Sequence, residues 1–163
     1  MKKLFYLLPL FFIACTAGKK STGNTNAFQQ HIDAVKKQYA PDGRTALFAV
    51  TSNGRVIKGE TNLPQAKAAL IESLQKGQET FIDSIEVLPS ASLNGKHYAV
   101  VTVSVANMRS KPDHPAELST QATLGTLLRV WKSHRGWYYV QTPDHYLSWV
   151  DAGGIELMNE AQF

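Results

Sequence analysis

The hydrophobic pattern of this 163-residue chain changes once, near residues 90–96. Before this stretch, apolar residues recur at helical spacing in two segments, and β-rich runs lie between and after them. After it, helical periodicity disappears, and short strand-like runs alternate with glycine and Pro-Asp turns. The stretch itself, SASLNGK, is rich in small polar residues, which is typical of a boundary. The pattern predicts one domain at 28–93, a second at 94–158 and a short tail at 159–163.

The first domain has the predicted order helix, strand, strand, helix, strand. Its first helix carries one apolar stripe at intervals of four, three and four residues, formed by Phe28, Ile32, Val35 and Tyr39. Asn53-Gly54 separates two β-rich runs and predicts a hairpin. A second helix is predicted between Pro64 and Gly77, and a strand follows that ends at Pro89. This order favours a small α+β layer with both helices on one face of the sheet.

Two segments of this domain, GRVIKGETNLPQAKAAL and FIDSIEVL, resemble the BON-type domain, a small module of exported bacterial proteins. The resemblance covers about 45 residues of the chain. It implies a BON-like α+β fold for this part of the chain.

The second domain contains four strand-like runs, YAVVTVSVAN, GTLLRVWKSH, GWYYVQTP and YLSWVD. Several short strands in so few residues predict a small barrel or a two-layer β fold. In the third run, alternation sends Trp137 and Tyr139 to one face and Tyr138 and Val140 to the other. One face must form the core. The other is either further packing or an aromatic shelf for a ligand.

The segments VANMRSKP, AELSTQATLGT and VWKSHRGWYYVQTPDHYLSWVD resemble a bacterial SH3-like domain. In that family an N-x-R-S-x-P signature leads from a strand into a long loop, and strands of the forms G-W-Y-x-V and G-W-V follow. The usual glycine before the last tryptophan is Ser148 here. The resemblance implies an all-β SH3-like barrel, and its signature positions are Asn107, Arg109, Ser110, Pro112, Gly125, Val130, Gly136, Trp137, Tyr138, Val140, Trp149 and Val150.

More narrowly, AELSTQATLG and YVQTPDHYLSWVD resemble the N-terminal region of NlpC-type cell-wall peptidases, which cut peptidoglycan stem peptides after D-glutamate. In some members an acidic loop residue and a tyrosine bind the free amino end of the substrate. The matching positions are Glu117 and Tyr146. A carboxylate suits an ammonium group, and a tyrosine supplies an apolar wall with a polar tip. The alternative is a solvated loop charge and a half-buried barrel residue. His145 stands where the family often has glycine.

The catalytic half of that peptidase family is missing from the sequence. Its nucleophile lies in a D-C-S-G-like motif, whereas Cys15 is the one cysteine of this chain. Cys15 lies at a predicted lipid site near the N-terminus, and lipid would block its thiol. No activated thiolate is then available, so the chain is not expected to be an enzyme by itself. No cofactor is expected. No metal site is expected either, because the five histidines are scattered: His31, His97, His114, His134 and His145.

The N-terminus predicts export. Lys2 and Lys3 precede an apolar run that is too short to span a bilayer, and Cys15 follows. Residues 12–14 resemble a lipobox, although leucine is usual where Phe12 stands. We therefore expect a signal peptide at 1–14 and a lipidated Cys15 at the start of a flexible tether, 15–27. An ordinary signal peptide cut nearby is the alternative.

By resemblance to the usual sorting rule, a threonine after the cysteine favours the outer membrane, facing the periplasm. Loss of the leader would lower the net charge from +4 to about +2, because it removes two lysines. With export and without a dense basic patch, a nucleic-acid partner is not expected.

These features favour a lipid-anchored envelope protein that binds a peptidoglycan stem peptide or docks on a partner peptidase. One alternative is the substrate-gating N-terminal part of an NlpC-type γ-D-glutamyl-diamino acid endopeptidase. Another is an interaction lipoprotein without a small ligand. The residues expected to bind the ligand are Arg109, Glu117, Tyr138, Tyr146 and Trp149.

Overall fold

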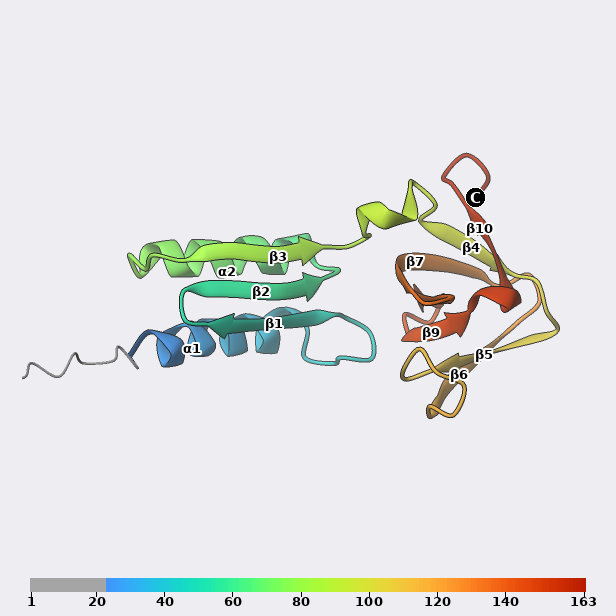
Figure 1. Ribbon diagram of the computed structural model, residues 1–163, viewed down its shortest axis with the longest axis horizontal. Helices are drawn as coiled ribbons and strands as arrows, with labels where there is room; N and C mark the ends of the chain where they lie inside the picture. The colour runs from blue at the N-terminus through green and yellow to red at the C-terminus, as the bar shows by residue number, and fades with distance from the viewer. Residues whose placement is uncertain (1–22) are drawn as a thin grey trace, which may run out of the picture.

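The computed structural model describes residues 23–163, with side chains described from Phe28 onward. They form two domains that follow one another along the long axis of the molecule (Figure 1). The expected signal peptide at 1–14, the lipid site at Cys15 and most of the expected tether lie outside the described residues. Within 23–163, no helix combines the length and the apolar character that crossing a membrane requires.

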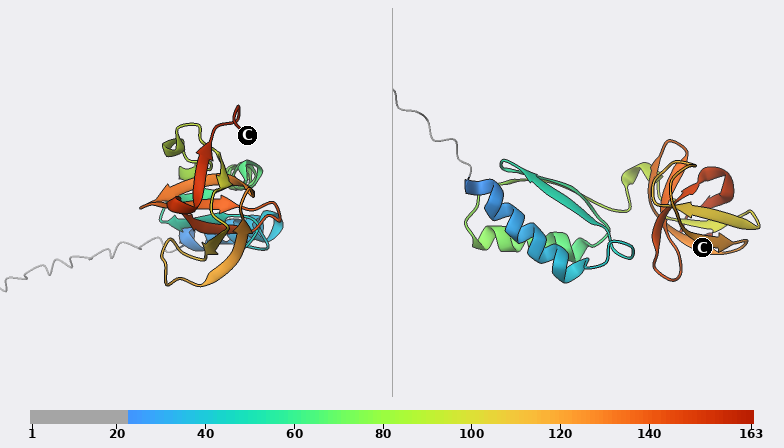
Figure 2. Two further views of the ribbon diagram at one scale, coloured as in Figure 1. Left: turned by 90° about the vertical axis from the view of Figure 1, so that its right-hand side faces the viewer. Right: turned by 90° about the horizontal axis from the view of Figure 1, so that it is seen from below.

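The N-terminal domain has the predicted order helix, strand, strand, helix, strand. Both helices cover one face of its sheet, which is seen edge-on in the right-hand view of Figure 2. Strands β1 and β2 form the predicted antiparallel hairpin, and β2 pairs with β3 in parallel after the crossover through α2. The elements are α1 (Gly23–Tyr39), β1 (Phe48–Asn53), β2 (Val56–Thr61), α2 (Pro64–Lys76) and β3 (Ile82–Val87). The BON-like identity of this domain stays a prediction.

Helix α1 begins at Gly23, five residues before the predicted start at Phe28. The last residues assigned to the tether, 23–27, are therefore helical. They are small or polar, so the apolar stripe from which the helix was predicted could not extend over them. The stripe itself is confirmed: Phe28, Ile32 and Val35 are buried against β1 and α2.

Gly59 lies in the middle of β2, opposite Val50 of β1. Its φ of 139° is a conformation that side chains rarely adopt, and a Cβ atom there would collide with the carbonyl oxygen of Ala49. The backbone of β1 therefore approaches β2 at a point that only glycine permits.

The C-terminal domain is all-β, as predicted, and forms a seven-stranded antiparallel sheet in the order β10-β4-β7-β8-β9-β5-β6. The sheet curls around an apolar core that includes Met108, Val130, Val140 and Val150 (Figure 2, left). The strands are β4 (Tyr98–Val101), β5 (Val105–Arg109), β6 (Leu118–Thr123), β7 (Leu127–His134), β8 (Trp137–Gln141), β9 (Leu147–Asp151) and β10 (Ile155–Met158).

The stretch predicted as the domain boundary, 90–96, has regular structure of its own. It forms a short helix, η1 (Ala91–Leu93), in which Leu93 is buried in the core of the C-terminal domain. Ser90 N also donates a 2.8 Å hydrogen bond to Trp131 O of β7. The boundary therefore lies before Ser90, a few residues earlier than predicted. A single buried leucine among small polar residues gives no periodicity, which is why the pattern missed it.

The two domains meet in an apolar cluster, which we call the interdomain joint. Backbone and side-chain groups tie the two domains together beside it: Leu147 N donates to Arg44 O over 2.7 Å, and Gln141 Nε2 donates to Thr45 O over 3.0 Å. Lys132 of β7 forms an ion pair with Glu60 of β2. The joint consists of Leu88, Trp131 and Leu147, with Leu47 and Tyr139 partly buried against them.

Candidate functional site

The loop between β5 and β6 is closed at its base by hydrogen bonds. Arg109 Nη1 donates to Ala116 O over 2.8 Å, and Ser110 N donates to Glu117 O over 2.9 Å. The guanidinium of Arg109 thus holds the far end of the loop. This anchoring fixes the backbone at Glu117, where the loop enters β6.

A pocket of about 380 Å³ lies where this loop faces the N-terminal domain. We call it the interdomain pocket. It contains two predicted ligand-binding residues, Glu117 from the loop and Tyr146 from the segment before β9. The lining residues are Arg44, Ser110, Glu117, Leu118, Ser119, Tyr146 and Leu147.

Tyr146 is positioned by a tight turn between β8 and β9. Thr142 N donates to Tyr146 O over 3.0 Å, and His145 N donates to Thr142 O over 2.8 Å. His145 has a φ of 70°, in the left-handed region that favours glycine. The glycine common in the resembled family at this position therefore has a backbone reason. In this chain histidine adopts the same turn at some conformational cost.

Arg44 reaches the pocket from the loop between α1 and β1. Its Nε and Nη2 atoms donate to Asp42 Oδ1 and Oδ2 over 3.0 and 2.8 Å. These side-chain hydrogen bonds lower the pKa of Asp42 from 3.8 to about 2, and the pKa of Arg44 is raised in turn. Arg44 Cζ lies 5.9 Å from the Tyr146 ring centroid. Arg44 could not be predicted as a site residue from the sequence, because only the docking of the two domains brings it to the pocket.

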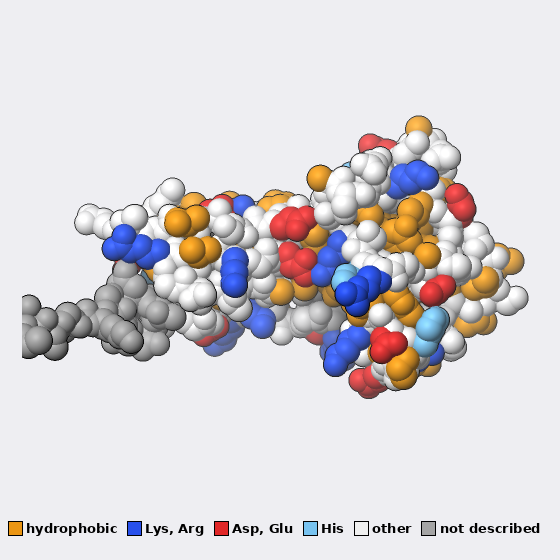
Figure 3. Space-filling view, in the orientation of Figure 1, with side chains coloured by type: hydrophobic (Ala, Val, Ile, Leu, Met, Phe, Trp, Pro, Cys, Tyr) orange, Lys and Arg blue, Asp and Glu red, His pale blue; other side chains and the backbone are white. Residues whose placement is uncertain are grey.

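Trp149 lies on the outer face of the β7-β8-β9 sheet, away from the barrel core. Its ring centroid is 5.0 Å from that of Tyr139, and Lys132 Nζ is 5.2 Å from both rings. Burial, together with the carboxylate of Glu60, raises the pKa of Tyr139 to about 12. Figure 3 shows acidic and basic side chains next to one another where the two domains meet.

The predicted alternation in β8 is confirmed. Trp137 and Tyr139 share the outer face, whereas Tyr138 and Val140 face the barrel core. Tyr138 packs against that core and so lies on the opposite face from Trp149. The structure therefore does not bring Tyr138 together with the other predicted ligand-binding residues. The outer face is itself partly covered, because Leu47 and Leu88 of the joint pack on it.

A second hollow of about 310 Å³ lies on the other side of the loop. Arg109 lines it, together with His114, Trp137 and Asp151. The His114 ring meets Trp137 edge-on at 5.0 Å, and His114 Nε2 is 3.9 Å from Asp151 Oδ2. Arg109 and Glu117 thus serve different hollows. Among residues 23–163, no three His, Cys, Asp or Glu side chains gather as a metal site would require.

The family model of the bacterial dipeptidyl-peptidase SH3 domain matches residues 108–155. The match begins in β5, includes the loop and the tight turn, and ends at the start of β10. The match supports a bacterial SH3-like domain in the C-terminal part of the chain, which confirms that part of the resemblance. The N-terminal domain lies outside the match. A search of curated proteins found no match to this chain.

Proposed function

We propose that this chain is a binding protein of the bacterial envelope whose interdomain pocket holds the free amino end of a cell-wall peptide. The observation that carries the proposal is the meeting of Glu117 and Tyr146 in one pocket. They come from opposite ends of the matched SH3 segment, and the fold brings them together. The peptidase in the name of the family model supports a peptide as the ligand.

The chemistry of the two side chains suits an ammonium group. The Glu117 carboxylate supplies the charge for a charge-assisted hydrogen bond, and the Tyr146 ring supplies an apolar wall with a polar tip. The backbone that carries each side chain is held before the ligand arrives, at Glu117 by the closed loop and at Tyr146 by the tight turn. Such preorganisation reduces the ordering cost of binding.

The proposal assigns binding rather than cleavage to this chain. The resembled peptidases use a cysteine nucleophile, and the one cysteine here is Cys15, the proposed lipid site. Acyl chains on Cys15 would anchor the protein to the outer membrane, facing the periplasm, since each buried methylene contributes about 0.8 kcal/mol. A bound peptide would then be held close to the membrane surface, available to a separate peptidase.

Calorimetric titration with the tripeptide L-Ala-γ-D-Glu-L-Lys tests the proposal. The full chain is titrated with this peptide and with its N-acetyl form, which lacks the ammonium charge. We expect N-acetylation, or Glu117→Gln, to weaken binding about 10- to 100-fold, the effect of one charged hydrogen bond. Equal binding of the two peptides by the wild type would refute the proposal.

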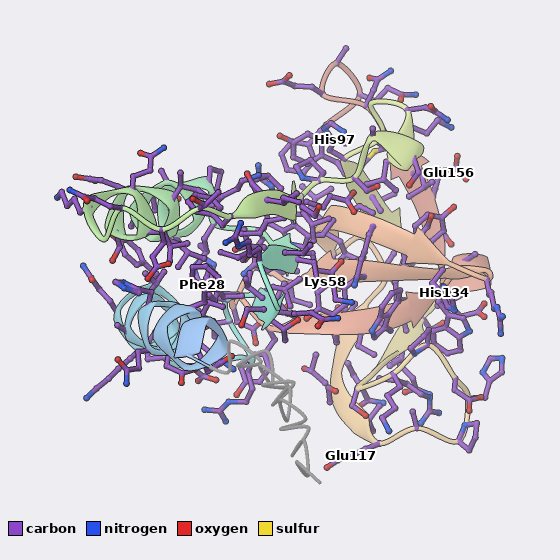
Figure 4. All side chains as sticks on the ribbon, turned by 60° about the vertical axis from the view of Figure 1, so that its left-hand side comes forward. Phe28, Lys58, His97, Glu117, His134 and Glu156 are labelled. Atoms are coloured by element: carbon purple, nitrogen blue, oxygen red, sulfur yellow. The ribbon has the colours of Figure 1, made fainter. Side chains whose placement is uncertain are left out.

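Glu156→Gln is the matched control. Glu156 is an exposed carboxylate on β10 of the same domain, and Figure 4 shows it at the opposite end of the domain from Glu117. The two substitutions remove the same charge. Unequal effects on binding therefore report the position of Glu117, rather than the net charge of the protein.

A further inference from the structure

Arg44 forms one wall of the interdomain pocket, and the SH3-like domain supplies the other lining residues. We infer that Arg44 binds a carboxylate that the ligand carries next to its ammonium group. The pocket would then select a zwitterionic peptide end. This inference rests on the proposed function, because it concerns the same pocket and the same ligand.

Two hydrogen bonds fix the loop that carries Arg44. Leu147 N donates to Arg44 O, so the backbone of Arg44 is tied to the first residue of β9. Gln141 Nε2 donates both to Thr45 O over 3.0 Å and to His145 O over 2.9 Å. One side-chain amide thus joins the Arg44 loop to the turn that carries Tyr146. The hydrogen bonds of Gln141 therefore fix the position of Arg44 relative to Tyr146.

Asp42 orients the guanidinium of Arg44 but occupies only some of its N–H donors. Among the described residues, Asp42 accepts hydrogen bonds from the Nε and Nη2 atoms of Arg44. A guanidinium has five N–H donors, so Nη1 and part of Nη2 remain for a second carboxylate. Arg44 is well exposed, with 69% of its side chain accessible, so a ligand can reach these donors.

The charges in the pocket favour a ligand of mixed charge. Glu117 is negative, and Arg44 is positive with Asp42 at its far side. An ammonium group placed against Glu117 and a carboxylate placed against Arg44 would each meet the opposite sign. A γ-linked glutamyl residue after an N-terminal residue has this form, because its α-carboxylate stays free. The amine and that carboxyl carbon are about 7 Å apart at most in an extended chain.

The test compares L-Ala-γ-D-Glu-L-Lys with the same peptide in which the α-carboxylate is an amide, the D-isoglutamine form. The full-length wild type is expected to bind the carboxylate form about tenfold more tightly. In Arg44→Gln this preference should fall to about onefold. Lys58→Gln, on an exposed position of β2, is the matched control and should keep the preference.

Removal of Arg44 also leaves Asp42 with an unpaired negative charge, which would repel a carboxylate by itself. The double variant Asp42→Asn/Arg44→Gln removes both charges and keeps the local net charge unchanged. If Arg44 contacts the carboxylate, the double variant also lacks the preference. If the double variant binds the carboxylate form as the wild type does, the inference is wrong.

The possible failures are distinguishable. If the wild type binds neither peptide, the proposed function and the inference both fall. If the wild type binds both peptides equally, and N-acetylation still weakens both, the proposed function stands and the role of Arg44 is refuted. If Arg44→Gln weakens binding of both peptides by the same factor, Arg44 only supports the shape of the pocket, and the inference is again wrong.

Discussion

The amide nitrogen of Leu147 donates a 2.7 Å hydrogen bond to the carbonyl oxygen of Arg44, joining a strand of the SH3-like domain to a loop of the N-terminal domain. Leu147 is also part of the buried joint, with Leu88 and Trp131. The same few residues therefore connect the domains and form one wall of the pocket. A change that loosens the joint is expected to disturb the pocket as well.

Truncation of a joint residue tests how much the joint contributes to stability. Leu88 is 3% exposed, so Leu88→Ala should lower the free energy of unfolding by about 2 to 4 kcal/mol through lost burial and the cavity left behind. Urea unfolding followed by tryptophan fluorescence measures the loss, and Trp131 in the joint is one reporter. Leu124→Ala, at a position 64% exposed, is the control and should change stability by less than about 0.5 kcal/mol. Equal losses of unfolding free energy for the two substitutions would contradict the burial of Leu88 in the joint.

Gly59 should not tolerate a side chain. Gly59→Ala places a Cβ atom against the carbonyl oxygen of Ala49, so the β1-β2 pairing must shift. We expect a loss of at least about 2 kcal/mol of stability, confined to the N-terminal domain. Gly43→Ala is the control, because its Cβ would meet open space. The melting temperatures of both variants are measured by thermal unfolding. A wild-type melting temperature for Gly59→Ala would contradict the close approach of the Ala49 carbonyl oxygen to Gly59.

Tyr139 should make stability fall at high pH. Its pKa is raised from 10.0 to about 12, chiefly by burial and further by Glu60. Between about pH 10 and pH 12 the folded protein keeps a proton that the unfolded chain has lost, so the contribution present below pH 10 is lost as the pH rises. Tyr139→Phe should show a smaller drop in unfolding free energy between pH 9 and pH 11.5. The same drop in the variant and the wild type would exclude this role.

Arg109 is expected to act on the loop rather than directly on the ligand. Arg109→Gln removes the hydrogen bond to Ala116 O and should cost about 0.5 to 1.5 kcal/mol. Hydrogen exchange should then become faster at the amide of Ser110, which donates to Glu117 O. Peptide binding should weaken in parallel, because Glu117 would no longer be preorganised. Unchanged exchange at Ser110 would mean that the loop closes without Arg109.

The elements with a strong local signal could be predicted from the sequence. The stripe from Phe28 to Tyr39 gave the first helix, Asn53-Gly54 gave the hairpin, and alternation in β8 correctly separated Trp137 from Tyr138. Glu117 and Tyr146 were placed together by resemblance, and the fold puts them in one pocket. In each case the information lies within a few neighbouring residues or in a family pattern.

The features that depend on contacts between domains could not be predicted. Arg44 follows Pro41-Asp42-Gly43, an ordinary turn sequence, and it becomes a pocket residue only through the docking of β9. Leu93 lies in the small polar stretch that predicts the domain boundary, yet it is buried in the core of the C-terminal domain. Tyr138 and Trp149 are both expected to bind the ligand, although the pleat sends the two side chains to opposite faces of the sheet. Residue type alone does not report which face is covered.

A double-mutant cycle on Glu117 and Tyr146 tests the central claim most directly. Dissociation constants for L-Ala-γ-D-Glu-L-Lys are measured with the wild type, Glu117→Gln, Tyr146→Phe and the double variant. If both side chains contact one ammonium group, each single variant weakens binding, and the double variant loses less than the sum of the two free-energy losses. Single variants that bind the peptide as tightly as the wild type would contradict the account.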